Sequence, residues 1–424
     1  MKINKPAPLR TFAINKNALI LSQILVIVFL LALVAIPLAQ AQTFSVIHDF
    51  SLTGNGWDGA YPFAGVTLRA GTLFGTTAQG GNGPATGPGT IYQMTHVGPD
   101  WTYTPIFVFP KDGSGGGGPS NSLFGPDHHL YGIVGGGSGG DGIIFNLTPP
   151  LSICKTANCF WKQKILYSFM GGASDGSGPT GDLTWDQQGN IYGTTAKGGP
   201  EDVGSVYELT PSGSGWSEHI LYFFRGYKGP GNPSGGVIFD SKGNLWGTAG
   251  SIVFELTYLP GVGWEENVIH SFQEGSDGTA LVAGLIADSA GNFYGATTQG
   301  GSGGGGTVFE LSPSGDSYTF QVLYSFSGGG GPRASLTMDA AGDLYGTTWR
   351  DGAYQKGTVF KLSNTPNGWV YSLLHEFTGG GDGAEPISQV TIDTDGTLYG
   401  TASQGGSSPY CLTNGCGVVW MITP

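Results

Sequence analysis

One ten-residue stretch, Asp339–Thr348, constrains the fold of this chain more than any other feature, because close copies of it recur along the sequence. The aromatic residue of its Leu-Tyr-Gly core returns at intervals of 48 to 61 residues. A period of this size is typical of repeat architectures, in which each unit packs only against its neighbours. The seven aromatic positions are Phe74, Tyr131, Tyr192, Trp246, Tyr294, Tyr345 and Tyr399.

Each repeat is predicted to form four short strands, named A to D in chain order, because apolar and polar residues alternate and no stretch suits a helix. Strand A ends on an aspartate such as Asp339, and Gly342 three residues later indicates a type I turn into strand B. Strand B carries Leu-Tyr-Gly-Thr-Thr. A glycine-rich loop leads to strand C, for example residues 307–311, and strand D ends on a phenylalanine such as Phe169.

Strand D carries a second ring, a Trp or Tyr eight residues before its final Phe, as in Trp161 and Phe169. An even spacing places both rings on one face of a strand. We therefore expect each repeat to present one aromatic face to a neighbour, with each buried ring contributing about 2 to 3 kcal/mol.

The two ends of the repeat region predict a closed ring. The first strand after the leader, residues 45–50, is a lone strand D, and the chain stops just after a strand C at residues 418–422. The lone strand finds its A, B and C partners only at the opposite terminus, which seals a propeller without free edges. The predicted fold class is all-β: a seven-bladed β-propeller with four strands per blade, closed by the N-terminal strand pairing with the C-terminal blade. An open β-solenoid is the alternative.

The first 41 residues have the layout of a secretory signal: four basic residues and no acid in residues 1–17, then an apolar run and a small-x-small pattern ending at Ala41. We predict a signal peptide at 1–41 and a single propeller domain at 42–424, in a protein that is secreted, periplasmic or at the cell surface. The alternative is an uncleaved leader, which would be the only attachment to a membrane.

The charge balance argues against nucleic acid as a partner, since the chain has 30 acidic and 17 basic residues and four of the basic residues lie in the leader. The four cysteines form two C-x4-C pairs, Cys154/Cys159 and Cys411/Cys416. In an exported protein this spacing favours two local structural disulfides. Half of a zinc site is the alternative for either pair.

The combination of Asp-Gly-x-x-Pro, Asp-x-x-Gly-Asn-Leu-Tyr-Gly-Thr-Thr, Gly-Thr-Val-Phe-Lys-Leu and Val-Leu-Tyr-Ser-Phe resembles the GloVer (Gloeo/Verruco) tandem repeat of exported bacterial proteins. One unit carries the motif at 288–298, 306–311 and 322–326, and the match extends over nearly all of residues 44–424. Such proteins are often called choice-of-anchor proteins because a variable sorting signal follows the repeats. Here Pro424 follows strand C almost directly, so we expect free secretion or retention through the leader. The resemblance implies export and no particular activity.

No catalytic motif is visible, which favours a non-enzymatic role. His48, His270 and His375 occupy a strand D position that Tyr fills in other repeats, so we interpret them as packed rings. One aspartate set ends strand A and forms turns. A second set precedes Gly in the loop from strand D to strand A, and we expect it to surround the central opening, where it could bind calcium or a cationic ligand. The alternative is an ordinary turn. The second set is Asp58, Asp112, Asp175, Asp277 and Asp382.

Aromatic residues that do not repeat lie in the loops of the same rim, and blade packing does not explain them. Rings beside acids and glycine-rich backbone suit a sugar or a peptide. These rings are Trp57, Tyr61, Tyr227, Trp349, Tyr354 and Tyr410. We expect a monomeric exported module that binds an extracellular polysaccharide or protein through its loops. The alternatives are a polysaccharide lyase or hydrolase that uses paired carboxylates, and a passive adhesion module.

Overall fold

The computed structural model describes residues 42–52, 58–81, 87–98, 100–135, 140–150, 159–213, 215–226, 231–273, 275–409, 411 and 414–424. The chain divides into two compact units, Met1–Gln42 with Pro424 and Thr43–Thr423, and all strands lie in the second. The predicted signal peptide at 1–41 lies outside the described residues. Within the described part of the chain, no helix is long and apolar enough to cross a membrane.

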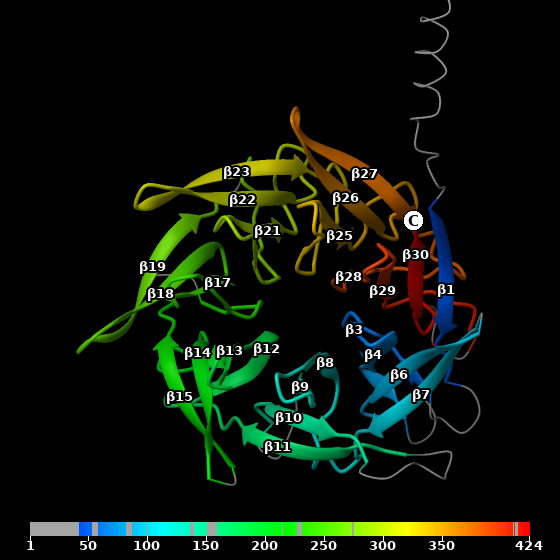
Figure 1. The fold of residues 1–424 in the computed structure, drawn as a ribbon, viewed down its shortest axis with the longest axis horizontal. Coiled ribbons are helices and arrows are strands. Elements are labelled where there is room, and N and C mark those ends of the chain that lie inside the picture. The colour runs from blue at the N-terminus through cyan, green and yellow to red at the C-terminus, as the bar shows by residue number, and fades with distance from the viewer. Residues whose placement is uncertain are drawn as a thin grey trace, which may run out of the picture. The chain divides into compact units, whose positions relative to one another are not determined.

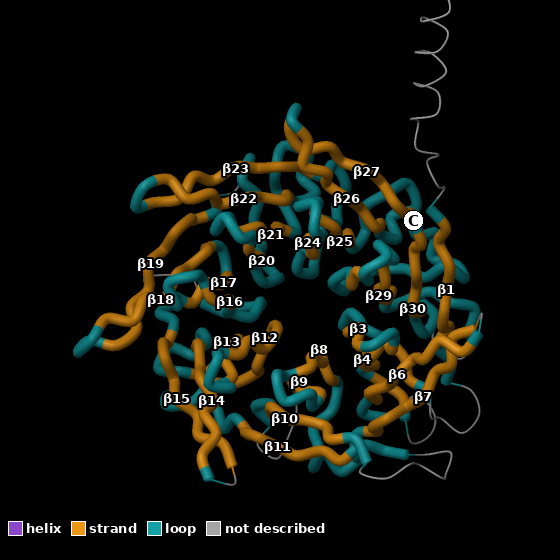
Figure 2. The backbone as a smooth tube through the Cα atoms, viewed as in Figure 1, coloured by secondary structure: helices purple, strands orange, loops and turns teal. Residues whose placement is uncertain are grey.

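Seven four-stranded antiparallel sheets form a ring of blades around a central opening (Figure 1 and Figure 2). This confirms the predicted seven-bladed β-propeller. From the centre outwards, strands A to D are as follows: blade 1, β3 (Thr67–Arg69), β4 (Thr72–Thr77), β6 (Thr90–Val97) and β7 (Asp100–Val108); blade 2, β8 (Pro119–Phe124), β9 (Leu130–Val134), β10 (Ile143–Thr148) and β11 (Lys162–Ser168); blade 3, β12 (Gly176–Trp185), β13 (Ile191–Gly198), β14 (Ser205–Ser212) and β15 (Gly215–Phe223); blade 4, β16 (Ile238–Phe239), β17 (Leu245–Ala249), β18 (Ile252–Leu259) and β19 (Gly263–Ser271).

The remaining blades follow the same order, and one short extra sheet pairs β2 (Gly59–Ala60) with β5 (Gln79–Gly80). Strands A to D are β20 (Ile286–Ala287), β21 (Phe293–Thr297), β22 (Thr307–Ser314) and β23 (Ser317–Ser325) in blade 5; β24 (Thr337–Met338), β25 (Leu344–Thr348), β26 (Thr358–Thr365) and β27 (Gly368–Glu376) in blade 6; and β28 (Thr391–Ile392), β29 (Leu398–Ala402), β30 (Val418–Thr423) and β1 (Thr43–Asp49) in blade 7.

The N-terminal strand closes the ring as predicted. Strand β1 runs antiparallel beside β30, with Val46 opposite Trp420 (Figure 1). On the inner side, the Thr391 hydroxyl of blade 7 donates a hydrogen bond to the Val66 carbonyl of blade 1. Both ends of the chain therefore contribute to one blade, and that blade is joined to the next by backbone and side-chain contacts.

The recurring stretch is a structural unit whose residues have separate tasks. In blade 6 the Asp339 carbonyl accepts a hydrogen bond from Gly342 N at 3.0 Å, which confirms the predicted turn, and the Asp339 carboxylate accepts one from the Tyr345 hydroxyl at 3.0 Å. A Cβ on Gly346 would lie 2.6 Å from the Phe360 ring, so this glycine makes room for the aromatic residue of strand C.

The two threonines that follow link strand B to its surroundings. The Thr347 hydroxyl donates to the Ser388 carbonyl of the next blade at 2.9 Å, and the Thr348 hydroxyl bonds the Thr358 hydroxyl of strand C at 2.8 Å. The motif therefore marks a buried inner strand, and the function has to be sought in the loops that flank it.

The predicted one-sided aromatic face of strand D is wrong, because every D strand contains a β-bulge. In blade 5, Val308 pairs with Tyr324 and Phe309 pairs with Val322, which leaves Leu323 as the extra residue. One extra residue reverses the alternation of side chains beyond it. The extra residue is Ile or Leu in all seven blades: Ile47, Ile106, Leu166, Leu221, Ile269, Leu323 and Leu374.

The bulge makes each D strand bridge two blade interfaces. Tyr318 of β23 packs edge-on against Trp246 of blade 4, whereas Phe326, eight residues later, packs against Phe360 of blade 6. The two rings that the sequence placed on one face thus lie in separate hydrophobic clusters.

The outer strands of neighbouring blades are joined by ring pairs. The side chain two residues before the final Phe of one D strand meets the side chain six residues before the final Phe of the next. His270 stacks on Phe320 with ring centroids 3.9 Å apart. The same contact recurs in the pairs His48–Tyr103, Tyr324–Tyr371 and His375–Phe44. The predicted packed-ring role of the three histidines is confirmed.

At two interfaces, between blades 2 and 3 and between blades 3 and 4, a glutamate side chain takes the place of the second ring. The Tyr222 hydroxyl donates to Glu266 Oε2 at 3.0 Å, and Tyr167 lies within the electrostatic influence of Glu218. Burial, reinforced by the charge of Asp175, raises the pKa of Glu218 to about 7. Because burial penalises the charged form of this carboxyl group, the native state is more stable when the group is protonated.

We expect the free energy of unfolding to fall as pH rises from about 4.5 to about 7, because native Glu218 keeps its proton in this range while the unfolded chain releases it. Urea unfolding at pH 5 and pH 8 measures the effect. Glu218→Gln should reduce the difference between the two midpoints, and Glu265→Gln, an exposed carboxyl on β19, should leave it unchanged. An identical pH dependence in wild type and Glu218→Gln would contradict this assignment.

Candidate ligand site at the mouth of the central channel

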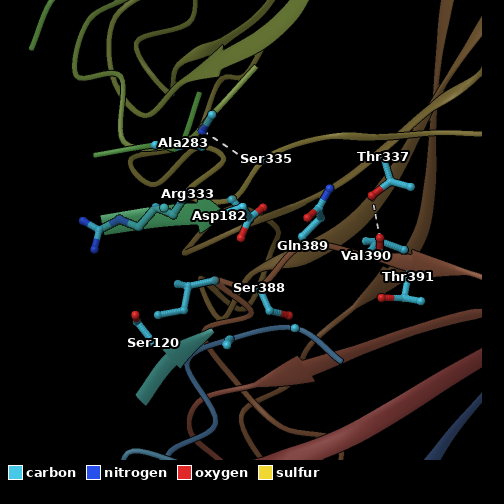
Figure 3. Close-up of a pocket in the computed structure, with 18 of the residues that line it drawn as sticks. Ser120, Asp182, Ala283, Arg333, Ser335, Thr337, Ser388, Gln389, Val390 and Thr391 are labelled. Carbon is cyan, nitrogen blue, oxygen red and sulfur yellow. Dashed lines mark hydrogen bonds between the residues drawn. The ribbon is translucent and has the colours of Figure 1, made fainter. Parts of the chain in front are cut away.

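A cavity of about 470 Å³ lies at the centre of the ring (Figure 3). All seven blades contribute to its wall through the end of the D–A loop and the start of strand A. Its volume falls in the range of small-molecule sites. The wall is built largely of Gly, Ala, Ser and Thr, because successive strand A starts approach closely: a Cβ on Gly236 would lie 2.1 Å from the Asp182 carbonyl oxygen.

The side chains that differ between repeats gather at the mouth. We define the mouth ring as the residue three positions before the Val or Leu that directly precedes β3, β16, β20, β24 and β28, together with the equivalent residues of β8 and β12. Its members are Phe63, Ser120, Thr180, Ser234, Val282, Arg333 and Ile387. All of these except Thr180 line the cavity. Among the described residues of the cavity wall, Phe63 is the single aromatic, Arg333 the single cation and Asp182 the single acid.

Phe63 and Arg333 lie two blades apart, on either side of blade 7. The Phe63 ring is 46% exposed and has Tyr61 beside it, with ring centroids 6.4 Å apart. Two residues deeper than the mouth ring, Gln389 of blade 7 is held by a hydrogen bond from its Nε2 to the Leu336 carbonyl at 2.9 Å. Blades 6, 7 and 1 therefore supply a cation, an amide and an exposed ring to one side of the mouth.

The two largest side chains held in a left-handed backbone conformation lie on the same side. Six of the seven blades have a residue in the left-handed region at the same point of the D–A loop, and in blades 2 and 3 this residue is Gly118 and Gly178. In blades 4 and 5 it is Asn232 and Ala280, both at φ 59°, and in blades 1 and 7 it is Tyr61 at φ 58° and Glu385 at φ 53°. A large side chain in this region costs free energy and is a pointer to function.

Glu385, two residues before Ile387 of the mouth ring, is the centre of a polar cluster. Its Oε1 accepts hydrogen bonds from Arg350 Nε at 2.9 Å and Nη2 at 2.6 Å, and its Oε2 accepts one from Gln404 Nε2 at 2.6 Å. The Arg350 guanidinium carbon lies 4.0 Å from the ring centroid of Trp349, and that of Arg333 lies 3.5 Å from it. One face of an indole does not accommodate two guanidinium groups at these distances, so the two arginines cover opposite faces.

This sandwich changes the predicted role of Trp349. Sequence reasoning assigned Trp349 as a ring for stacking on a ligand, whereas here its faces are covered by Arg333 and Arg350. The loop backbone fixes the arrangement, since Trp349 N donates to the Gly331 carbonyl at 3.1 Å and Arg350 N donates to the Gly330 carbonyl at 3.0 Å. Trp349 thus positions the arginines.

The aspartates of the D–A loops do not surround the central opening as predicted, and none of them lines the cavity. They come early in the loop, where the chain is still beside the outer strand. Asp382 accepts a hydrogen bond from Thr378 N at 2.8 Å and lies 3.4 Å from His375 Nε2. Asp175 accepts one from Met170 N at 2.7 Å. Asp58 and Asp277 lie 3.2 and 3.4 Å from His48 and His270, and Asp112 accepts from Ser114 in an exposed turn.

The other predicted residues are spread over several places. Tyr354 is 57% exposed and lies further along the Trp349 loop, away from the cavity wall. Cys411 and Cys416 form the predicted disulfide, and the Cys416 carbonyl accepts a hydrogen bond from Tyr61 N at 2.8 Å. Cys159 is disulfide-bonded as well. Trp57, Tyr227, Tyr410 and Cys154 lie outside the described residues.

Within the described ranges, no group of three or more His, Cys, Asp or Glu side chains is arranged to hold a metal ion. Calcium binding therefore stays a prediction of the sequence. Phe63, Arg333 and Glu385 were not predicted from the sequence, because the prediction relied on residue patterns typical of catalytic, metal-binding and sugar-binding sites. Aligning the repeats at the proline of the D–A loop would have shown that these positions vary between blades.

The fold and the mouth define a closed β-propeller with a ligand-sized central cavity. Residues 249–424 match the model of the Gloeobacter/Verrucomicrobia repeat family. The predicted resemblance is confirmed, and this part of the propeller carries that family's repeat. No curated protein matches the sequence.

Solved structures confirm the fold at low sequence identity. The extracellular domain of BT4673, assigned to a hybrid two-component system of B. thetaiotaomicron, aligns with a TM-score of 0.54 at 13% identity, over 90% of this chain and 42% of that one. The corresponding domain of BT3049 aligns with a TM-score of 0.52 at 13% identity, over 90% and 41%. The chain spans about two fifths of these two structures.

Proposed function

We propose that this protein is an exported, non-enzymatic binding module that holds an extracellular polysaccharide at the mouth of its central channel. The observation that carries the proposal is the gathering of non-repeating side chains in the mouth ring, with the exposed Phe63 on one side. A repeat scaffold has no packing reason to vary its loops at one point of the ring.

The chemistry of the wall suits a polyhydroxylated ligand. Hydroxyl groups of Ser and Thr, backbone groups and the Gln389 amide supply donors and acceptors, and an aromatic face stacks on the C–H face of a sugar ring. The disulfide between Cys411 and Cys416 fits an oxidising, extracytoplasmic compartment. A glycosidase needs two carboxyl groups at the scissile bond, and the described cavity wall brings one, Asp182.

Phe63→Ala is expected to weaken polysaccharide binding about tenfold, because one stacked ring contributes on the order of 1 kcal/mol beyond its buried area. Titration calorimetry against a panel of soluble neutral and acidic polysaccharides, using residues 42–424, measures the change. Tyr258→Ala is the matched control, since Tyr258 is 56% exposed in a C–D hairpin at the opposite face of the ring. Failure of every polysaccharide to bind, or equal affinity of wild type and Phe63→Ala, would overturn the proposal.

A further inference from the structure

Arg333 carries a positive charge that forms no ion pair with any carboxylate of the described residues, although the protein is acidic. The chain has a formal net charge of −13, and only four arginines follow the leader: Arg69, Arg225, Arg333 and Arg350. Two of these four, Arg333 and Arg350, contact the same tryptophan, Trp349. Such a concentration is unexpected for a surface on which acids outnumber bases, and it marks this point as a place for an anion.

The two arginines differ in their acidic neighbours. Arg350 is neutralised by Glu385, whose carboxylate is 11% exposed and has both oxygens hydrogen-bonded. Within the described part of the chain no carboxylate lies within ion-pair distance of the Arg333 guanidinium, and Figure 3 shows this guanidinium directed away from Asp182. Burial and the like charge of Arg350 lower the pKa of Arg333, whereas the charge of Glu385 raises it, and the two lowering effects outweigh the raising one. A bound anion would add to the partial compensation that Glu385 supplies.

The Arg333 side chain is also held in place before any ligand arrives. Its guanidinium lies on the Trp349 ring, which is backed on the other face by Arg350, which in turn is fixed by Glu385 and Gln404. A stacked guanidinium keeps its edge free for two parallel hydrogen bonds to a carboxylate. Pre-ordering a long side chain removes part of the entropy cost of binding.

From these contacts we infer that the polysaccharide is an acidic one, whose uronate carboxylate binds the Arg333 guanidinium while a sugar ring packs on Phe63 across blade 7. This inference rests on the proposed function and specifies its substrate class. Asp182 in the cavity wall disfavours a densely charged polyanion and favours one carboxylate per sugar unit. Arg333 is the binding residue, and Trp349, Arg350 and Glu385 are positioning residues.

Polygalacturonate and its fully methyl-esterified form test the inference, because the two polymers share a backbone and differ in the free carboxylate. We expect wild type to bind the free acid at least tenfold more tightly in 50 mM salt, and this preference to narrow as salt increases. Arg333→Gln should remove the preference, and Arg333→Lys should restore part of it. Arg225→Gln, which removes an exposed arginine near the outer edge of blade 3, should keep it.

The results distinguish a failure of the acidic specificity from a failure of the polysaccharide-binding proposal itself. Equal binding of both polymers by wild type and by Arg333→Gln, together with weaker binding by Phe63→Ala, would overturn the acidic specificity and leave a polysaccharide module. Equally tight binding of poly-glutamate would overturn the glycan as the ligand class. Binding of neither polymer nor of any polysaccharide in the panel would overturn both. Thermal melting of each variant shows whether a lost affinity reflects lost folding.

Discussion

A chain that lacks β1, residues 51–424, is expected to lose about 5 kcal/mol or more of unfolding free energy relative to residues 42–424. Strand β1 delivers Phe44 and Val46 to the interface of blades 6 and 7, and Ile47 lies with the fully buried Phe50 at the interface of blades 7 and 1. Each such side chain contributes about 1.5 to 3 kcal/mol on burial. Without β1 the ring also exposes β30 as an unpaired edge.

Equilibrium urea unfolding and size-exclusion chromatography measure the effect of this truncation. We expect aggregation or a greatly lowered midpoint, and we expect a synthetic peptide of residues 42–52, added in trans, to restore a monomer of native midpoint. A truncated chain that unfolds at the wild-type midpoint without the peptide would show that β1 does not seal the ring.

Trp420→Ala is expected to lower the free energy of unfolding by about 3 to 5 kcal/mol, the usual cost of removing a large buried ring. Trp420 is fully buried in strand C of the closing blade, where its ring covers Gly400 and packs near Phe44 and Phe377. The cavity left behind would lie between strands supplied by both ends of the chain, which limits the collapse that could fill it.

Trp420→Phe is the matched variant. The other six blades carry Tyr or Phe at this position, and the buried indole N–H of Trp420 has no hydrogen-bond partner in the described structure. The smaller ring should cost less than about 1.5 kcal/mol, since it keeps most of the apolar contact and removes an unsatisfied donor. Chemical denaturation of both variants measures the difference, and equal losses for Ala and Phe would contradict the packing described here.

The parts of the fold that sequence predicted well are those that repeat. Seven copies of the strand B aromatic, Tyr345 in blade 6, and the lone strand at residues 45–50 were enough to predict blade number and closure. The face of the D-strand rings was mispredicted because an inserted residue such as Leu323 looks like any other apolar residue until its partner strand is known. The face of the sheet on which a side chain lies depends on how its strand pairs with the neighbouring strand. The sequence of one strand alone does not show that pairing.

The candidate site was the least predictable part, for two physical reasons. Its residues vary between repeats, so the periodicity that predicts the fold does not mark them. They also come together only through ring closure: Phe63 and Glu385 are far apart in sequence and lie in adjacent blades 1 and 7. Tyr61 and Trp349 were both chosen because they do not repeat; Tyr61 lies beside Phe63, and Trp349 stacks with Arg333.

The most direct test of the proposed site is a crystal structure of residues 42–424 with a tetragalacturonate ligand. We expect a uronate carboxylate within hydrogen-bond distance of the Arg333 guanidinium and a sugar ring on Phe63, at the mouth formed by blades 6, 7 and 1. A ligand bound at the outer D strands, or at the face that carries the A–B turns, would contradict this expectation.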